Sequence, residues 1–397
     1  MRSNKTMKNL RRYGRFLALL GTLPFLVPCS PGAQKSAGSR EYLVYIGTYT
    51  RENSKGIYVC RLDAATGKLS ALALAAETIN PSFLTLHPNG KFLYAANETP
   101  NYEGKAGGSL TGYAIEPSTG KLTVLNTVSS RGAGPCYVAV DKSGKSLLAA
   151  NYGGGSVVAV PVRNDGRLGE ASAFVQHTGS SVNPKRQQAP HAHSINLSRD
   201  NRFAVAADLG LDQLLVYAFD PVKGSLVPND PAFARLNPGA GPRHFAFHPD
   251  GRFGYVINEI QSTVTSLAYE ASRGVFKELQ TISTLPENFQ GNNSTAEVQV
   301  HPTGKFLYGS NRGHDSIAVF AIDSNKGTLT SIEQVSTQGK TPRNFGIDPT
   351  GSYLLAANQN SNTIVVFAIN PKTGRLTPTG QVLEVGSPVC VKFLAVN

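Results

Sequence analysis

GPRHFAFHPDGRFGYVINE, residues 241–259, decides the fold of this chain, because its pattern returns about every 50 residues. Its centre is the hydrophobic hexamer FGYVIN, which follows the turn HPDG and ends in Asn. Related hexamers ending in Asn, Asp or Thr occur at 43–48, 92–97, 146–151, 203–208, 306–311 and 353–358. The chain therefore contains seven copies of one unit.

Each unit has the residues for four short antiparallel strands. A short alternating run and a turn precede six of the seven hexamers, which is the pattern of a β-hairpin. Behind every hexamer comes a third apolar run, such as VTSLAYE, and then a turn with Gly followed by Leu or Phe. Seven such units predict an all-β fold, a seven-bladed β-propeller in which each small sheet buries both faces against its neighbours.

The first unit lacks the run that should precede its hexamer. The chain ends, however, with an apolar run at 389–396 that has no local partner. We therefore predict that this C-terminal run forms the innermost strand of the first blade and closes the ring. Because the repeats continue without a break, we expect one propeller domain over residues 42–397.

Residues 1–33 have the composition of a secretory signal. They contain six basic residues, no acidic ones and an apolar run at 16–27. The run is too short for the roughly 20 residues that a membrane-spanning helix needs. We therefore expect an exported protein, periplasmic or secreted, with a signal peptide at 1–33, a linker at 34–41 and no membrane span.

Cys29 leaves two forms of processing open. It follows Leu26, Val27 and Pro28, which resembles a lipoprotein box with Pro where a small residue usually stands. One outcome is a lipid anchor at Cys29. The other is ordinary signal cleavage near Ala33.

The net charge does not indicate a nucleic-acid partner. The formal charge of the whole chain is +12, from 38 basic and 26 acidic residues, but six of the basic residues lie in the predicted signal. The rest of the chain carries 32 basic against 26 acidic residues, a charge of +6. It has no basic tract interleaved with aromatic residues, so we predict no nucleic-acid binding.

Beyond Cys29 the chain contains Cys60, Cys136 and Cys390. Their odd number and the absence of C-x-x-C or zinc-type spacing argue against a disulfide framework and against a Cys-based metal site. We predict buried, apolar roles for these thiols.

Histidine shows how the repeats separate structural from functional residues. His87, His248 and His301 occupy the hairpin turn, where other units carry Asp or Ser at the same position. A residue type that recurs in phase serves the repeat itself. We therefore predict that these three histidines cap the turn by hydrogen bonding.

Two other positions differ from unit to unit and invite a functional interpretation. The position that opens the innermost strand carries Ser82, Cys136, His193, Arg243, Ala296, Arg343 and Val389. The position after the hexamer carries Tyr49, Glu98, Tyr152, Leu209, Glu259, Arg312 and Gln359. The two strands form a hairpin, so the start of the first lies beside the end of the second, and both sets should meet at one rim of the channel.

This rim would gather His193, Arg243, Glu259, Arg312 and Arg343. Arginine offers paired donors to a phosphate or carboxylate, and His or Glu can move protons near neutral pH. The set therefore suits a small anionic substrate. In the alternative interpretation, Arg243 and Glu259 form an ion pair between neighbouring strands that only stiffens the rim.

The insertion at 177–193 leads into this rim. It adds Arg186, Gln187 and His191 as candidate substrate-binding residues. His191 and His193 could share one strand face, but no carboxylate or third ligand lies nearby in the sequence, so we predict no metal site.

Four stretches carry a resemblance to a known family. They are RQ-x-x-PHAHS at 186–194, GPRHFAFHPDGRFGYVINE at 241–259, SNRGHDSIAVF at 310–320 and the run from TPRNFGIDPTG onward at 341–367. They resemble the seven-bladed propeller lactonases, which include bacterial 6-phosphogluconolactonases and, more distantly, fungal carboxymuconate lactonising enzymes. The resemblance covers essentially the whole chain after the predicted signal.

The resemblance implies hydrolysis of a sugar δ-lactone by a 6-phosphogluconolactonase-like enzyme, without a metal or other cofactor. It places the catalytic His, Arg and Glu at His193, Arg243 and Glu259, with Arg312 and Arg343 as further anion ligands. The substrate of the cytosolic enzymes is phosphorylated, whereas this chain has an export signal. An unphosphorylated or acidic sugar lactone is therefore an open alternative.

Different classes of function remain open at this stage. In a lactonase, Glu259 or His193 would activate water, and Arg243 would stabilise the developing oxyanion. A non-enzymatic exported propeller would use the same rim to bind a glycan or a protein, since a fold alone does not give a function. A carboxymuconate-type lactonising enzyme is a further alternative. We expect a monomer with a small anionic or sugar lactone as its ligand.

Overall fold

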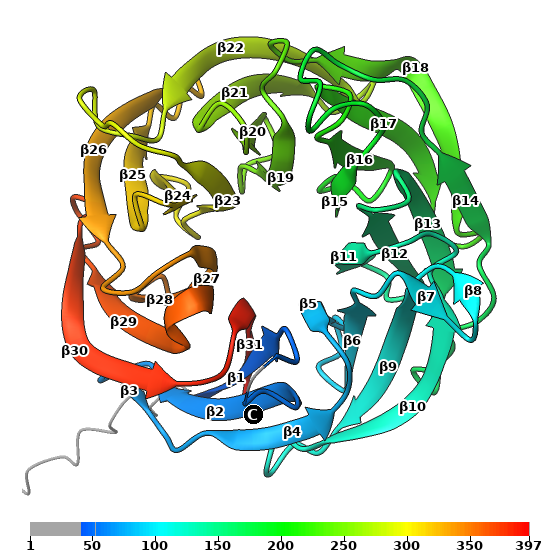
Figure 1. The fold of residues 1–397 in the computed structure, drawn as a ribbon, viewed down its shortest axis with the longest axis horizontal. Coiled ribbons are helices and arrows are strands. Elements are labelled where there is room, and N and C mark those ends of the chain that lie inside the picture. Colours follow the sequence, from blue (N-terminus) through cyan, green and yellow to red (C-terminus); the bar gives the residue numbers. More distant parts are fainter. Residues whose placement is uncertain (1–40, 52, 397) are drawn as a thin grey trace, which may run out of the picture. The chain divides into compact units, whose positions relative to one another are not determined.

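The computed structural model describes residues 41–51 and 53–396. Seven small antiparallel sheets stand around a central channel (Figure 1), which confirms the predicted seven-bladed β-propeller. The helical structure of the described residues is the short 3₁₀ turn η1 (Gln359–Ser361), and none of it is long and apolar enough to cross a membrane. The predicted signal peptide, Cys29 and residues 34–40 of the predicted linker lie outside the described residues.

The strands of each blade follow one another from the channel to the outside. The innermost strands are β5 (Pro81–Leu86), β11 (Pro135–Val140), β15 (Ala192–Leu197), β19 (Pro242–Phe247), β23 (Ser294–Val300), β27 (Pro342–Ile347) and β31 (Pro388–Ala395). The second strands are β1 (Glu41–Thr48), β6 (Phe92–Asn97), β12 (Ser146–Asn151), β16 (Phe203–Asp208), β20 (Phe253–Asn258), β24 (Phe306–Arg312) and β28 (Tyr353–Asn358). The third strands are β2 (Gly56–Asp63), β9 (Ser109–Ile115), β13 (Ser156–Pro161), β17 (Gln213–Asp220), β21 (Thr263–Glu270), β25 (Ser316–Ile322) and β29 (Thr363–Ile369). The outer strands are β3 (Lys68–Leu69) with β4 (Ala73–Glu77), β10 (Leu122–Ser129), β14 (Ala173–Gln176), β18 (Ser225–Arg235), β22 (Val275–Ser283), β26 (Leu329–Ser336) and β30 (Leu376–Glu384), and β7 (Asn101–Tyr102) pairs with β8 (Lys105–Ala106) in a separate hairpin.

The blades pack against one another through the second strands, which the repeated hexamers form. Neighbouring side chains on a strand point to opposite faces. Leu307 therefore belongs to the apolar cluster shared with the preceding blade, and Tyr308 to the cluster shared with the following blade. The hydroxyl of Tyr308 also donates a 2.8 Å hydrogen bond to the carbonyl of Gly374 in that following blade. Each hexamer thus connects three consecutive blades.

The last strand closes the ring as predicted. β31 pairs antiparallel with β1, in a register that runs from Tyr42 opposite Ala395 to Thr48 opposite Pro388. The first blade therefore combines the two ends of the described chain in one sheet (Figure 1).

The turn histidines cap their turns as predicted, and they also join neighbouring blades. In the turn of β23 and β24, Nδ1 of His301 accepts a 3.2 Å hydrogen bond from the backbone N–H of Thr303. Its Nε2 donates a 2.9 Å hydrogen bond to the carbonyl of Gly351, in the corresponding turn of the next blade. His87 and His248 make the same two kinds of contact. The recurring histidines therefore serve the architecture.

Every innermost strand has a β-bulge near its start. In β19, Pro242 pairs with Asn258 and His244 with Ile257, so that Arg243 is the extra residue. The other blades have one extra residue at the same place. A bulge interrupts the ladder and re-aims the side chain of the extra residue. Because of the bulge, the side chain at this position does not follow the regular alternation between the two faces of the sheet.

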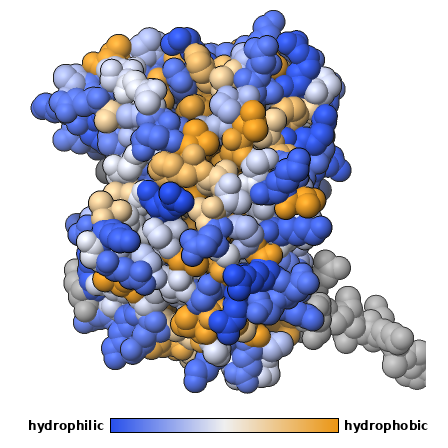
Figure 2. Space-filling view, turned by 90° about the vertical axis from the view of Figure 1, so that its right-hand side faces the viewer, coloured by the Kyte–Doolittle hydropathy of each residue, from blue (hydrophilic) through white to orange (hydrophobic). Residues whose placement is uncertain are grey.

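On the side of the ring seen in Figure 2, apolar residues lie in the middle of the face and hydrophilic residues surround them. Isolated exposed apolar side chains, such as Val222 and Val182, are ordinary on a protein surface. The chemistry predicted from the sequence lies instead at the channel.

Removal of residues 389–397 should abolish the folded state, because the first blade would lose its innermost strand and β1 would expose an unpaired edge. The measurement is the yield of soluble protein and its thermal unfolding by circular dichroism. A truncated chain that unfolds cooperatively at the temperature of the parent would contradict the closure of the ring by β31.

Candidate active site

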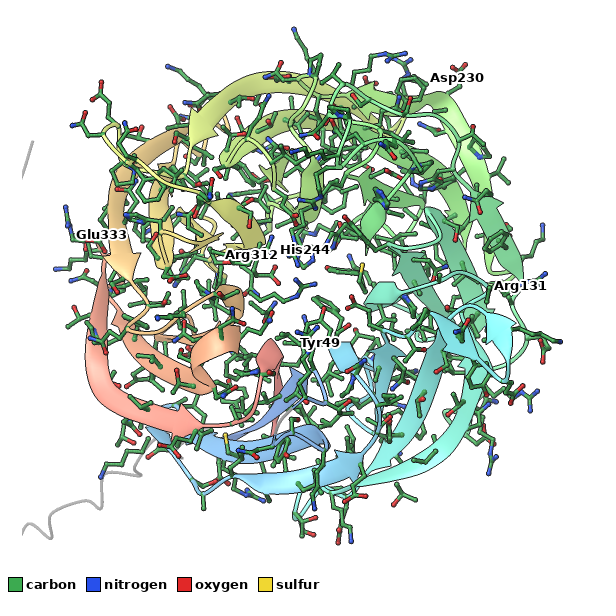
Figure 3. The ribbon with its side chains drawn as sticks, viewed as in Figure 1. Tyr49, Arg131, Asp230, His244, Arg312 and Glu333 are labelled. Atoms are coloured by element: carbon green, nitrogen blue, oxygen red, sulfur yellow. The ribbon has the colours of Figure 1, made fainter. Side chains whose placement is uncertain are left out.

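A cavity of about 240 Å³ opens at one end of the channel. Its lining consists of Glu98, Cys136, Tyr152, Arg186, His193, Glu259, Arg312 and Arg343. All of these residues except Arg186 occupy one of the two variable positions, at the start of an innermost strand or at the end of a second strand. Figure 3 shows Arg312 and Tyr49 beside the channel, whereas Glu333 and Asp230 lie at the outside of the ring.

Glu259 lies at the centre of a network of arginines. One carboxylate oxygen accepts a 2.6 Å bond from Nη2 of Arg186. The other oxygen accepts a 3.1 Å hydrogen bond from Nε of Arg243 and forms a 2.9 Å ion pair with Nη2 of Arg312. The carboxylate is buried, with 7% of its side chain exposed. The predicted pair of Arg243 and Glu259 is therefore present, as part of a four-residue cluster.

The surroundings of Glu259 keep its carboxylate ionised. Burial alone would raise its pKa, but the charges of Arg312 and Arg243 outweigh burial and hold the pKa well below its usual range. A carboxylate in this state accepts a proton only weakly, and its lone pairs already face guanidinium donors. Glu259 is well suited to hold arginines in place and poorly suited to remove a proton from water.

Arg243 lies behind Glu259 and does not line the cavity. Its side chain is only 2% exposed, and Nη1 donates a 2.7 Å hydrogen bond to the carbonyl of Ala296. Burial and the charges of Arg312 and Arg343 lower its pKa, but a guanidinium remains protonated in a protein. The sequence-based role of Arg243 in contacting the substrate therefore does not match its placement.

His193 is a neutral imidazole at the cavity. Burial, followed by the charge of Arg243, lowers its pKa well below the usual value. Its Nδ1 lies 3.5 Å from the sulfur of Cys136, whose own pKa is raised by burial so that it remains a thiol. Among the described residues, Nε2 of His193 has no hydrogen-bond partner, so this nitrogen is free to act on a ligand.

Arg343 presents unused donors to the same cavity. Its guanidinium lies over the ring of Tyr49, 5.3 Å from the ring centroid. It forms neither a hydrogen bond nor an ion pair with another described residue. The hydroxyl of Tyr49 donates a 2.9 Å hydrogen bond to Glu98. Arg343 therefore keeps hydrogen-bond donors available at the cavity.

The residues of the insertion have three different placements. Arg186 reaches the cavity as predicted. His191 stacks on Tyr152 at 4.6 Å between ring centroids and supports that ring without lining the cavity. Gln187 is fully buried, and its amide bonds the carbonyl of Leu209 and the carboxylate of Asp212, each at 2.8 Å. The prediction that Gln187 contacts the substrate does not fit this placement, because its polar atoms are used inside the protein.

Sequence reasoning did not select Glu98, Tyr152 and Cys136, although the structure places all three in the cavity lining. They occupy the same two variable positions as the selected residues. Tyr152 and Cys136 carry neither a charge nor an imidazole, whereas position in the repeat identifies all three. Position in the repeat was therefore the stronger signal.

The cysteines of the described chain, Cys60, Cys136 and Cys390, are free and buried, as predicted. Within residues 41–51 and 53–396, no group of three or more His, Cys, Asp and Glu side chains is placed to hold a metal ion.

Comparison with known proteins connects this geometry to a family. The family described as "Lactonase, 7-bladed beta-propeller" matches residues 43–393. The chain is 38% identical over 354 residues to a protein of Bacillus subtilis named 6-phosphogluconolactonase, covering 89% of this chain and 99% of that protein. A 6-phosphogluconolactonase of Formosa agariphila is 35% identical over 309 residues, 77% of this chain and 86% of that protein. The solved structure of the periplasmic gluconolactonase of Pseudomonas aeruginosa superposes with a TM-score of 0.85 at 37% identity, covering 90% of this chain and all of that one (100%).

Glu259→Gln should lower the free energy of unfolding by about 3–5 kcal/mol, because buried guanidinium groups would lose their counter-charge. The measurement is chemical denaturation at pH 7. The matched control is Glu333→Gln, which removes a 2.7 Å ion pair with the exposed Arg375 at the outside of the ring. An exposed pair contributes up to about 1 kcal/mol, so equal losses in the two variants would contradict the central role of Glu259.

Proposed function

This chain belongs to the seven-bladed β-propeller lactonase family, and from that premise we propose that it hydrolyses a sugar lactone with an anionic substituent in the cavity at the channel mouth. One observation carries the proposal: the neutral imidazole of His193 and the unused guanidinium of Arg343 line the same small cavity. The first can accept a proton, and the second can bind an anion.

The charge of the site favours an anionic ligand. Four arginines stand at or directly behind the cavity, but Glu259 and Glu98 supply only two negative charges. Three of the arginines bind Glu259, which leaves Arg343 for the ligand. Glu98 accepts a hydrogen bond from Tyr49 at one oxygen, and its other oxygen can accept a sugar hydroxyl. This combination suits a polar ring with a carboxylate or phosphate.

The choice of the base follows from the two candidate environments. Both groups are unprotonated at neutral pH, but arginine donors already occupy both oxygens of Glu259. Nε2 of His193 has no hydrogen-bond partner among the described residues, and His193 lines the cavity. In the proposed reaction, Nε2 of His193 takes a proton from water as the water oxygen bonds to the lactone carbonyl carbon. When the ring C–O bond breaks, the imidazolium returns that proton to the leaving oxygen, and a hydroxy acid results.

The oxyanion of the intermediate needs a cationic donor at the cavity. Arg312 lines the cavity and is fixed between Glu259 and the carbonyl of Thr295, to which Nη2 donates at 2.7 Å. Its Nε is buried without a hydrogen-bond partner among the described residues. We assign oxyanion stabilisation to Arg312 in place of Arg243. The proposed steps are assigned to side chains of this chain and, as the family resemblance implies, use no metal.

The place of action follows from the N-terminal sequence and from one relative. The predicted signal peptide and the similarity to a protein named as periplasmic both support export. Sugar phosphates belong to cytosolic metabolism, so an acidic sugar lactone with a carboxylate fits an exported enzyme better than a phosphorylated one.

The direct test is hydrolysis by the purified chain without residues 1–33. The substrates are δ-gluconolactone, its 6-phosphate and a sugar-acid lactone, each corrected for spontaneous hydrolysis. We expect turnover of the anionic lactones, and Arg343→Gln should raise their KM about tenfold or more through the lost ion pair, with little effect on δ-gluconolactone. Lack of hydrolysis with all three would contradict the proposal and favour glycan or protein binding at the same rim.

His193→Asn should lower kcat by about 10²-fold or more, the usual scale for loss of a general base, while the fold is retained. His301→Asn is the control, since its ring serves two turns far from the cavity lining. It should reduce thermal stability and leave kcat nearly unchanged. Comparable rate losses in the two variants would contradict the role of His193.

A further inference from the structure

A second layer of polar residues lies below the cavity. It is formed by one residue from each of three consecutive innermost strands, at the same position in the repeat, namely His244, Glu297 and Asn344. All three side chains are buried. The rings of Phe83 and Tyr137, from the corresponding position of two other blades, approach His244 edge-on at 5.6 and 5.1 Å between centroids. Figure 3 shows His244 beside the channel.

This layer separates two cavities. On its far side lies a cavity of about 420 Å³ whose lining includes Phe83, Tyr137, Glu297 and Lys392. On its near side, the ring of His193, which lines the smaller cavity, lies 5.3 Å from the ring of His244. The layer therefore forms the floor of the candidate active site.

A continuous chain of hydrogen bonds connects this floor to Glu259. Nε of Arg243 bonds Glu259, and Nη1 of Arg243 donates to Nε2 of His244 at 3.2 Å. Nδ1 of His244 lies 3.2 Å from Oε2 of Glu297. The amide of Asn344 donates to that same oxygen, and its own oxygen accepts the backbone N–H of Val391 at 2.9 Å.

The donors and acceptors of this chain fix one tautomer of His244. An arginine can only donate, so its contact favours the form of His244 with a lone pair on Nε2. The proton of the imidazole is therefore on Nδ1, where Glu297 accepts it. Burial and the charge of Arg243 lower the pKa of His244 well below its usual value, which agrees with a neutral ring.

We propose that Glu297 is a positioning residue of the active site: it holds His244 in the Nδ1–H tautomer, and His244 in turn holds Arg243 against Glu259. The consequence for catalysis rests on the lactonase function proposed above. The contact from Glu297 to His244 itself does not depend on that function.

A carboxylate in this layer is costly to keep ionised, because its solvation by water is lost. Burial raises the pKa of Glu297 to about 7, against the charges of Lys392 and Arg243 and the backbone N–H of Val298. The groups that face it are His244 and Arg243 from β19, Asn344 from β27, Cys390 and Lys392 from β31 and Tyr137 from β11. As the pH falls through about 7, the carboxyl of Glu297 gains a proton, and it becomes a weaker acceptor for the Nδ1–H of His244. The ionised form at higher pH is the one that fixes the network.

The test combines kinetics with nuclear magnetic resonance of ¹⁵N-labelled histidine. In the wild-type protein above pH 7, the nitrogen shifts of His244 should show a protonated Nδ1 and an unprotonated Nε2. In Glu297→Gln, the two tautomers should mix. With the lactone substrate, kcat should fall about 10- to 100-fold, the scale for groups that orient catalytic residues, with little change in KM. The inflection of kcat near pH 7 should disappear in this variant.

The control is again His301→Asn, which loses stability without touching the network. Wild-type kcat in folded Glu297→Gln, or an unchanged His244 tautomer, would overturn the proposal. If the wild-type chain hydrolyses no lactone, the proposed function fails, and the tautomer alone decides the role of Glu297. If Glu297→Gln does not fold, the pH titration of His244 in the wild-type protein decides: tautomer signals that stay constant from pH 6 to pH 8 would overturn the proposal.

Discussion

The candidate site depends on one interaction, the contact of the Glu259 carboxylate with three arginines. Guanidinium groups gathered around one carboxylate repel one another by on the order of a few kcal/mol per pair in a partly buried site. Glu259 compensates this repulsion, and it is effective because the same contacts hold it ionised. Without this carboxylate, the arginines would lack both a fixed position and a counter-charge. The cavity can therefore present cationic donors to a ligand in a preset arrangement, which lowers the cost of ordering them on binding.

The propeller supplies this arrangement by bringing distant residues together at the bulged starts of its innermost strands. Asp212 fixes the insertion at 177–193 relative to the innermost strand β19. One oxygen of Asp212 accepts two hydrogen bonds, from Nε2 of Gln187 at 2.8 Å and from the backbone N–H of Gly241 at 2.7 Å. Gln187 directly follows Arg186, and Gly241 directly precedes the strand that carries Arg243. A single buried carboxylate thus fixes the relative position of two arginines that bind Glu259, which gives Gln187 an architectural role.

The sequence predicted the blades, the closing strand and the rim because these follow from a repeat. Once seven hexamers are aligned, a hairpin dictates which positions meet, as it does for Arg243 and Glu259. The depth of each side chain could not be predicted in this way. Arg243 and His193 share one position in the repeat, but only His193 lines the cavity. This difference depends on neighbours from other blades, such as the carbonyl of Ala296 that receives Arg243. The placement of Gln187 differs from the expected one for the same reason, since its partners Leu209 and Asp212 lie outside its own segment.

The repeat also contains the signal for the second layer. One residue beyond the bulge, the units carry Phe83, Tyr137, Ser194, His244, Glu297, Asn344 and Cys390. Three consecutive blades thus place polar residues where others have apolar or small ones, and these three are joined by hydrogen bonds. Arg243 consequently lies between two carboxylates, bonded directly to Glu259 and through His244 to Glu297. A buried guanidinium with a counter-charge on each side can keep its charge and orientation without contact with solvent. In this arrangement Arg243 organises the site from below, and the groups that meet the ligand are those of the layer above it.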